Sequence, residues 1–190
     1  MNFEYLETER LKLRKLTDEL YELILTTKSD QEIMDLLCIA PNDLEKEKQK
    51  SVRGFGMFNK SMLLFQLIEK ESNYVIGWCG YHTWFTQHHR AEIGYMLYTD
   101  EVKQKGYMKE ALKPIIEYGF NTMNLNRIEA LIEPKNVPSL KLINHFNFRE
   151  EGLLKNHYLC SHKYGTRKND PTSYSRQDYT GQSILRQGSK

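Results

Sequence analysis

The sequence has 190 residues, 39% of them hydrophobic, and its 27 basic and 25 acidic residues leave a formal net charge of +2. This length fits one folded domain with a full core, and the near balance of charges gives no global positive field of the kind that binds nucleic acid. Because the sequence has no run of about 18 apolar residues and no signal-peptide pattern, we expect a cytoplasmic protein with neither membrane nor nucleic-acid partners.

The cysteines and histidines favour neither a disulfide framework nor a metal site. The three cysteines are an odd number and form no Cys-x-x-Cys pair, so free thiols are the preferred interpretation. His88 and His89 are adjacent and cannot easily turn to one ion together with His82. We therefore assign these histidines to a hairpin region and expect no metal.

The first third of the sequence predicts one strand and three helices. Residues 10–16 alternate apolar and basic side chains, as in a strand with one buried face. Thr17 can cap a helix over 18–26, and a second short helix covers 30–37. A break at 40–43 leads into the stretch 43–60, which begins as a charged helix whose side chains suit a water-facing surface.

Three strands follow, and their order predicts an antiparallel arrangement. Residues 62–69 and 74–83 are apolar runs joined by a turn at 70–73. Residues 92–98 form the third strand, after the region that contains the paired histidines. These three strands precede the longest predicted helix.

The stretch 91–120 is the part around which the rest is organised. Strand 92–98 runs through a short loop into a helix that begins after Gly106 and ends near residue 120. The free N–H groups and the dipole at a helix N-terminus attract anions. Positive charges gather at the same place: Lys103, Lys105 and Lys109. The prediction is a pocket for a phosphorylated ligand beside a strand end.

The last third predicts a strand, a helix and a further strand. Pro114 should bend the central helix without ending it. Residues 126–133 alternate as a strand, a helix opens at residue 136 or 138 and runs to about 145, and 146–158 supply the next strand. The segment 161–190 is polar and short of aliphatic residues, which favours a loop and a mobile terminus.

These elements together predict a mixed α/β fold built on a mostly antiparallel sheet. We expect a single domain over residues 1–160. The polar segment 161–190 is expected to be partly flexible. The alternative left open is that part of it forms a strand of the last hairpin.

Four segments of the sequence resemble a known family. They are ETERLKLRKL at the first strand, VIGWCGYHTW leading into AEIGYMLY, KQKGYMKEAL at the loop and helix, and EPKNVPSLKLINHFNFREEGLLK near the end. In this order and spacing they resemble the GNAT superfamily of N-acetyltransferases, in particular the Rim-type ribosomal-protein N-terminal acetyltransferases. The resemblance extends from Glu7 to about Tyr158.

The resemblance implies acetyl transfer from acetyl-CoA, as co-substrate, to a primary amine. It also implies a central mixed, mostly antiparallel sheet with helices on both faces and a splayed acetyl-CoA cleft between strands 92–98 and 126–133. The anion site inferred above would then hold the pyrophosphate. The implied cofactor-binding residues are Met96, Leu97 and Tyr98 on the strand, the amides of Gln104, Lys105, Gly106, Tyr107, Met108 and Lys109, and Asn136 at the later helix.

The chain departs from the family pattern at several positions. The family loop has Gln or Arg, two residues, Gly, one residue, then Gly or Ala, and here those positions are Lys103, Gly106 and Met108. Met108 is bulky where a small residue is usual, although the backbone donors are unaffected. Asn147 stands where the family has glycine after the later helix, and asparagine tolerates the left-handed turn needed there.

Three residues are candidates for proton transfer. By resemblance, Ser139 protonates the departing thiolate, although a first-turn serine behind an Asn136 helix cap is an equally ordinary arrangement. Glu92, on the strand beside the cofactor, is the first candidate base, and its alternative role is an ion pair with Arg90. His157 is the second candidate base, and its alternative role is purely structural.

The resemblance points to a protein N-terminal α-amine as the acceptor. A small amine, such as a polyamine, an amino acid or an aminoglycoside, is the alternative within the enzyme class, because the acceptor walls are the least specified regions. A non-catalytic module that binds acyl-CoA as a sensor is the alternative from another class. A homodimer is also left open.

Overall fold

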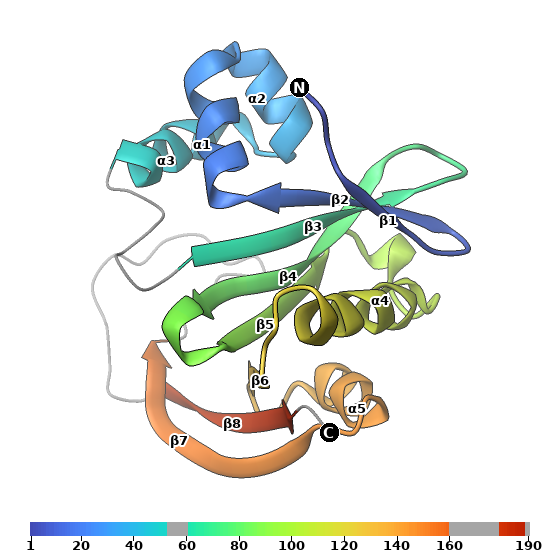
Figure 1. Ribbon diagram of the computed structural model, residues 1–190, viewed down its shortest axis with the longest axis vertical. Coiled ribbons are helices and arrows are strands. Elements are labelled where there is room, and N and C mark those ends of the chain that lie inside the picture. The colour runs from blue at the N-terminus through green and yellow to red at the C-terminus, as the bar shows by residue number, and fades with distance from the viewer. Residues whose placement is uncertain (53–60, 160–178, 189–190) are drawn as a thin grey trace, which may run out of the picture. The chain divides into compact units, whose positions relative to one another are not determined.

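The computed structural model describes residues 1–52, 61–159 and 179–188 (Figure 1). The strands are β1 (Tyr5–Glu7), β2 (Leu11–Thr17), β3 (Ser61–Glu69), β4 (Val75–Phe85), β5 (Arg90–Leu97), β6 (Arg127–Ile132), β7 (Arg149–Leu159) and β8 (Tyr179–Gly188). The α-helices are α1 (Asp18–Thr27), α2 (Asp30–Leu37), α3 (Pro41–Val52), α4 (Tyr107–Asn121) and α5 (Val137–His145). The chain folds as two compact units, Met1–Ile128 and Glu129–Gly188.

The first unit is built on an antiparallel array in which β1 to β5 lie in chain order. Alternation explains the strands, because Leu11 and Leu13 of β2 are fully buried while Lys12 between them is exposed. The turn between β3 and β4 uses Asn73 in the left-handed conformation, with φ of 59°. The predicted mixed α/β, mostly antiparallel fold is confirmed.

Helix α4 covers one face of this array (Figure 1). Phe65 of β3 meets Tyr118 of α4 edge to face, with 5.4 Å between the ring centroids. The buried Tyr81 of β4 donates a hydrogen bond of 2.8 Å to the carbonyl oxygen of Ile115. Ile115 lies one turn before Tyr118, so both contacts fix the same part of α4 to the sheet. The helix continues through Pro114.

Helices α1 to α3 pack against the opposite face of β2 and β3. Their apolar cluster includes Leu16, Ile24 and Ile33. A polar contact fixes the end of α2 to the strands, because Arg14 Nη2 and Gln66 Nε2 both donate to the carbonyl oxygen of Leu36 at 2.8 Å. Gln66 is only 3% exposed, so these hydrogen bonds satisfy a buried amide.

In the second unit, β7 pairs with β8 in antiparallel register, from Arg149 opposite Arg186 to Leu159 opposite Tyr179. Ile143 of α5 is fully buried. Asn147, between α5 and β7, has φ of 59°, which is the left-handed turn expected for the residue in glycine's place.

Three parts of the fold differ from the sequence-based prediction. Helix α3 begins at Pro41 instead of residue 43, because proline in a first helical turn lacks only an N–H group that would have no intrahelical partner. β1, three residues long, was not predicted. Residues 179–188 form β8 within the segment expected to be a loop, whereas 161–178 and Cys160 lie outside the described residues.

No helix in the described parts of the chain is long and apolar enough to cross a membrane.

Substitution of Gly119 by alanine should destabilise the first unit. A Cβ atom there would lie 2.8 Å from Cζ of Tyr81 and 3.1 Å from Cδ1 of Ile128, both closer than normal van der Waals contact. We expect a loss of about 1–3 kcal/mol in the free energy of unfolding, as for other overpacked cores, measured by urea denaturation. Gly152→Ala is the control, since a Cβ atom there meets nothing within 4 Å. Equal stability of the two variants would contradict the packing described here.

Candidate active site

The entrance to α4 is a turn that contains two left-handed residues. Gln104 has φ of 59° and Gly106 has φ of 84°, a region that glycine enters without steric cost. The first hydrogen bond of the helix runs from the N–H of Glu110 to the carbonyl oxygen of Gly106, at 3.0 Å. The N–H groups that precede this bond in the helix belong to Tyr107, Met108 and Lys109.

The three lysines near this turn are not equivalent. Lys103 forms an ion pair of 2.6 Å with Asp100, so part of its charge is already neutralised. Lys105 and Lys109 are exposed on either side of Gly106. Together with the helix N-terminus they leave a positive site that fits a diphosphate group.

Met108 does not obstruct this turn. Its side chain is only 7% exposed and belongs to the buried stripe of α4 together with Ala111 and Leu112. A bulky residue is therefore compatible with the loop, because its volume lies in the core while its N–H remains at the helix entrance.

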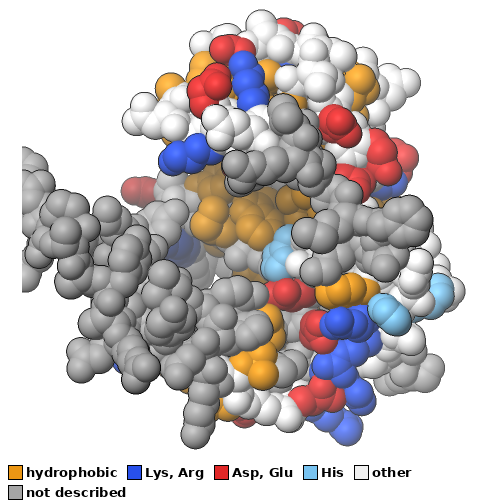
Figure 2. Space-filling view, turned by 90° about the vertical axis from the view of Figure 1, so that its left-hand side faces the viewer, with side chains coloured by type: hydrophobic (Ala, Val, Ile, Leu, Met, Phe, Trp, Pro, Cys, Tyr) orange, Lys and Arg blue, Asp and Glu red, His pale blue; other side chains and the backbone are white. Residues whose placement is uncertain are grey.

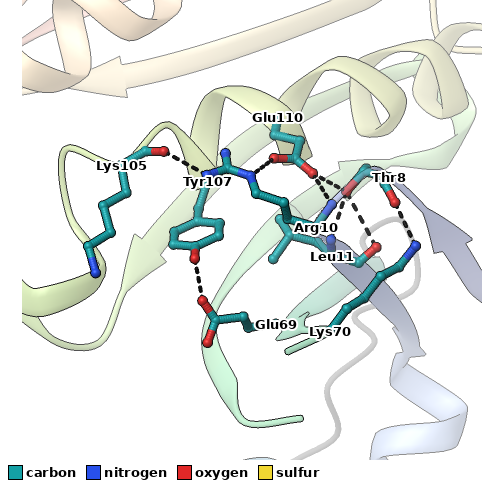
Figure 3. A network of polar contacts seen from close by, with 8 residues as sticks. All are labelled: Thr8, Arg10, Leu11, Glu69, Lys70, Lys105, Tyr107 and Glu110. Atoms are coloured by element: carbon teal, nitrogen blue, oxygen red, sulfur yellow. Dashed lines mark hydrogen bonds and ion pairs between the residues drawn. The ribbon is translucent and has the colours of Figure 1, made fainter. Parts of the chain in front are cut away.

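A carboxylate in the first turn of α4 ties the loop to the start of the chain (Figure 3). Glu110 accepts hydrogen bonds from the Thr8 hydroxyl at 2.6 Å and from the backbone N and the Nε of Arg10, each at 2.7 Å. Arg10 Nη1 in turn donates to the carbonyl oxygen of Lys105 at 3.0 Å, and the guanidinium lies 4.4 Å from the ring centre of Tyr107. Arg10 thus joins Lys105, just before Gly106, to the first turn of α4.

The hydroxyl of Tyr107 extends the same network to the sheet by donating to the carboxylate of Glu69 (Figure 3). Glu69 ends β3, and Lys70 next to it donates to the carbonyl oxygen of Thr8 at 2.7 Å. The loop before α4 is therefore fixed to the β1–β2 turn and to the end of β3.

Burial and hydrogen bonding act on Glu110 in opposite directions. Partial burial raises the pKa of this carboxyl group, but the hydrogen bonds from Thr8 and Arg10 and the charge of Arg10 outweigh it, so the pKa lies below its ordinary value. The ionised carboxylate is therefore the form that stabilises the fold.

A second group of functional side chains lies on the face of β4 and β5 opposite α4. Tyr81 pairs with Ile93 and Thr83 pairs with Glu92, so His82 is an additional residue at a β-bulge. Its Nε2 lies 3.5 Å from Oε1 of Glu92, and its Nδ1 lies 3.0 Å from Oγ1 of Thr83. The Glu92 side chain is 14% exposed and that of His82 is 37% exposed.

The surface beside this pair is apolar and concave. Figure 2 shows hydrophobic side chains gathered in a hollow beneath the lobe formed by α1 to α3, with a histidine and an acidic side chain at its rim. On this face β4 and β5 present Trp78, which is half-buried, and Met96, which is 45% exposed. The arrangement can receive an apolar group and place an attached amine near a carboxylate.

Tyr98 follows β5 and approaches the helical lobe. Burial, and then the nearby Cys38 thiol, raises the pKa of Tyr98 to about 12, so its hydroxyl stays protonated at neutral pH. The hydroxyl of Tyr21, on α1, donates to Oε2 of Glu47 on α3 at 3.2 Å. The hydroxyls of Tyr98 and Tyr21 thus lie in the same region of the first unit as the carboxylate of Glu47.

The remaining predicted residues belong to the second unit. Asn136 caps α5 by accepting a hydrogen bond of 3.2 Å from the backbone N of Ser139, so the capping role considered for it is present. Ser139 is partly exposed in the first turn of α5. His157 lies in β7.

Sequence reasoning missed His82 and Arg10 as parts of the site. His82 lies inside β4, within the strand predicted over 74–83, but it was grouped with His88 and His89 and given no part in the site. The extra residue in β4 relative to β5 was the available signal, but a bulge appears only when two strands are aligned. The contact between Arg10 and Glu110 joins residues far apart in the sequence and leaves no local pattern.

Replacement of Glu110 by glutamine should lower stability in a pH-dependent way. We expect the free energy of unfolding at pH 7 to fall by about 1–2 kcal/mol, since hydrogen bonds to a charged acceptor are lost. Because the folded-state pKa is lowered, this contribution is present above the unfolded pKa of about 4.3 and disappears as the pH falls below it. Thermal unfolding from pH 3 to 7 measures the difference, with Glu117→Gln at an exposed position of α4 as control. A pH-independent difference would contradict the role of the charge.

Comparison with known proteins identifies the family of the chain. A family model described as an acetyltransferase (GNAT) domain matches residues 10–149. The uncharacterized N-acetyltransferase p20 from Bacillus licheniformis is 39% identical over 168 residues, which cover 81% of this chain and 87% of that protein.

Solved structures share the fold. The ribosomal-protein-S5-alanine acetyltransferase from Vibrio fischeri is 19% identical with a TM-score of 0.63, and the match covers 97% of this chain and 96% of that one. The dodecameric spermidine N-acetyltransferase from Vibrio cholerae is 16% identical with a TM-score of 0.60 and 94% coverage of both chains. The extent of the family match decides the assignment: the chain belongs to the GNAT family of N-acetyltransferases, enzymes that use acetyl-CoA as co-substrate.

Proposed function

We propose that this enzyme acetylates the α-amine of a protein N-terminus. The observation that carries the proposal is an apolar hollow with an acidic side chain at its rim, together with the sheltered carboxylate of Glu92 on the face of β4 and β5 that carries Trp78 and Met96. A peptide N-terminus offers a matching pair of groups, since its first side chain can enter an apolar hollow while its ammonium group meets the carboxylate. The cytoplasm is the compartment in which this reaction would operate.

The reaction needs a neutral amine, and Glu92 is the proposed base. An ammonium group gives up one proton before its lone pair can attack the thioester carbonyl that acetyl-CoA supplies. A carboxylate that is 14% exposed is close enough to the surface to meet the ammonium and sheltered enough to interact strongly with it. A backbone N–H near Leu97 is the proposed donor to the developing oxyanion.

The loop before α4 supports the binding of acetyl-CoA. The amides of Gln104 to Lys109 are the proposed donors to the pyrophosphate, and the network of Arg10 and Glu110 keeps them in place without any ligand. Met96, Leu97 and Tyr98 are the proposed contacts of the pantetheine arm along β5. Asn136 is proposed to contact the same arm, and Ser139 to protonate the departing thiolate. His157 stays a second candidate for the base.

A small polyamine is the second candidate acceptor. The observation that favours it is the additional carboxylate of Glu47, held by the Tyr21 hydroxyl at 3.2 Å. A polyamine carries several positive charges along its length, and two separated carboxylates, Glu47 and Glu92, suit it better than they suit a single amine.

Thiol release from acetyl-CoA, measured with a panel of acceptors, tests the proposed function. We expect turnover with peptides that have a free N-terminus, none with the same peptides capped by an acetyl group, and slower turnover with spermidine. Calorimetric titration with acetyl-CoA should show binding without any acceptor. Faster turnover with spermidine than with every peptide would favour the polyamine candidate, and absence of acetyl-CoA binding would contradict both.

The role proposed for Ser139 predicts a loss in the chemical step. Ser139→Ala should lower kcat by about a hundredfold, the size of effect typical of a lost general acid, while the Kd for acetyl-CoA changes little. The helix cap should persist, because Asn136 bonds the backbone N of this residue and not its hydroxyl. Ser139→Thr is the control that keeps a hydroxyl. An alanine variant with the parent's kcat would show that the acid is another group.

A further inference from the structure

We propose that His82 is a positioning residue that receives the proton of the acceptor amine from Glu92 and passes it to solvent. This inference rests on the proposed function, since it describes how the base Glu92 is returned to its ionised form. The observations that carry it are a bulge that inserts His82 beside Glu92, a glycine that makes room for the ring, and the contacts of both ring nitrogens.

The bulge gives Glu92 two neighbours on β4 where a regular ladder would give one. Ile93 and Glu92 are consecutive on β5, but their partners Tyr81 and Thr83 are two residues apart on β4. His82 and Thr83 therefore both stand opposite Glu92. Bulges often re-aim a side chain next to an active site, and this one brings the imidazole Nε2 to 3.5 Å from the carboxylate.

Gly94 makes the position of the ring possible. A Cβ atom at Gly94 would lie 2.5 Å from Cδ2 and 2.9 Å from Nε2 of His82, so any other residue would displace the imidazole. The same Cβ atom would lie 3.1 Å from Cη2 of Trp78. Both rings thus overlie the glycine, which holds His82 in a defined place beside the hollow.

The imidazole of His82 is in the neutral form that a proton acceptor needs. Burial lowers the pKa of His82, so the imidazole is neutral at pH 7. In the tautomer with its proton on Nδ1, the ring donates to Oγ1 of Thr83 at 3.0 Å and presents the lone pair of Nε2 toward Glu92. Of the two side chains, His82 is the more exposed, at 37% against 14%.

The proton then moves through three positions. An N–H bond of the ammonium group breaks and an O–H bond forms on Glu92. That O–H bond breaks and an N–H bond forms at Nε2, which gives an imidazolium that stays next to the restored carboxylate. The imidazolium finally releases its proton to water, and the amine keeps the lone pair with which it attacks the thioester.

The described residues of the first unit place the following groups around the bulge. From β5 the carboxylate of Glu92 faces the ring. On β3 the residue opposite the bulge is Met62, between Ser61, which pairs with Trp84, and Leu63, which pairs with Tyr81. From α1, the carboxylate of Asp18 reaches Ser61 at the start of β3, at 2.9 Å. Glu92 is thus the group with which proton exchange is expected.

Removal of the imidazole should slow the reaction and change its pH profile. We expect His82→Ala to lower kcat/KM for the acceptor about tenfold to a hundredfold, at the lower end of effects on acid–base catalysis, with the KM for acetyl-CoA almost unchanged. Added imidazole should restore much of the rate in His82→Ala and none in the double variant with Glu92→Gln. His88→Gln, at an exposed position outside β4, is the control and should behave like the parent.

Two results would overturn the inference. One is a His82→Ala variant with the parent's rate and pH profile. The other is a loss of rate that imidazole does not restore and that follows a loss of thermal stability, since this is the pattern of a purely structural residue.

A titration that needs no turnover separates this inference from the proposed function. We expect the His82 imidazole, followed by NMR, to have a lower pKa in Glu92→Gln than in the parent, because a carboxylate 3.5 Å away favours the protonated ring. An unchanged titration would overturn the exchange between the two groups. If no amine is acetylated but the pKa of His82 still differs between Glu92→Gln and the parent, the proposed acetyl transfer is contradicted. The coupling between His82 and Glu92 is then still supported.

Discussion

The ionised carboxylate of Glu110 is the contact on which the turn before α4 depends. It lies in the first turn of α4 and accepts three hydrogen bonds from residues about a hundred positions earlier in the sequence. Through Arg10 it also fixes the carbonyl oxygen of Lys105. A loop of backbone N–H donors binds a phosphate well only when its amides are already oriented toward the phosphate. The hydrogen bonds of Glu110 and Arg10 hold the loop in one conformation in the folded chain.

The two faces of the sheet in the first unit differ in how they are packed. The face under α4 is largely apolar and closely packed, and the buried Tyr81 there donates its hydroxyl to a carbonyl oxygen of the helix. On the opposite face, α1 to α3 pack over β2 and β3, and β4 and β5 present Trp78, His82 and Glu92. Rigid packing on one face therefore gives the proposed site on the other a fixed support.

Local patterns predicted most of the elements and the turn at Gly106 before α4, because strand alternation, helix caps and glycine turns depend on neighbouring residues. That this turn binds an anion stays a prediction. The contacts that organise the site are non-local. Nothing near Arg10 indicates Glu110, and the bulge at His82 exists only in the alignment of β4 with β5. For the same reason a loop was favoured for the segment that contains β8, with a share in the last hairpin left open, since β8 owes its strand conformation to pairing with β7.

The fit between Gly94 and His82 has a consequence for how these positions evolve. The ring occupies the volume that a side chain at position 94 would need, so neither residue can change size freely while the other stays as it is. A chain that keeps the histidine has no room for alanine or serine in place of the glycine, and a chain without it has that room once the ring of Trp78, 3.1 Å from the added Cβ atom, also shifts. The two positions should be inherited as a pair, and that pair would mark the branch of the family that shares this acceptor site.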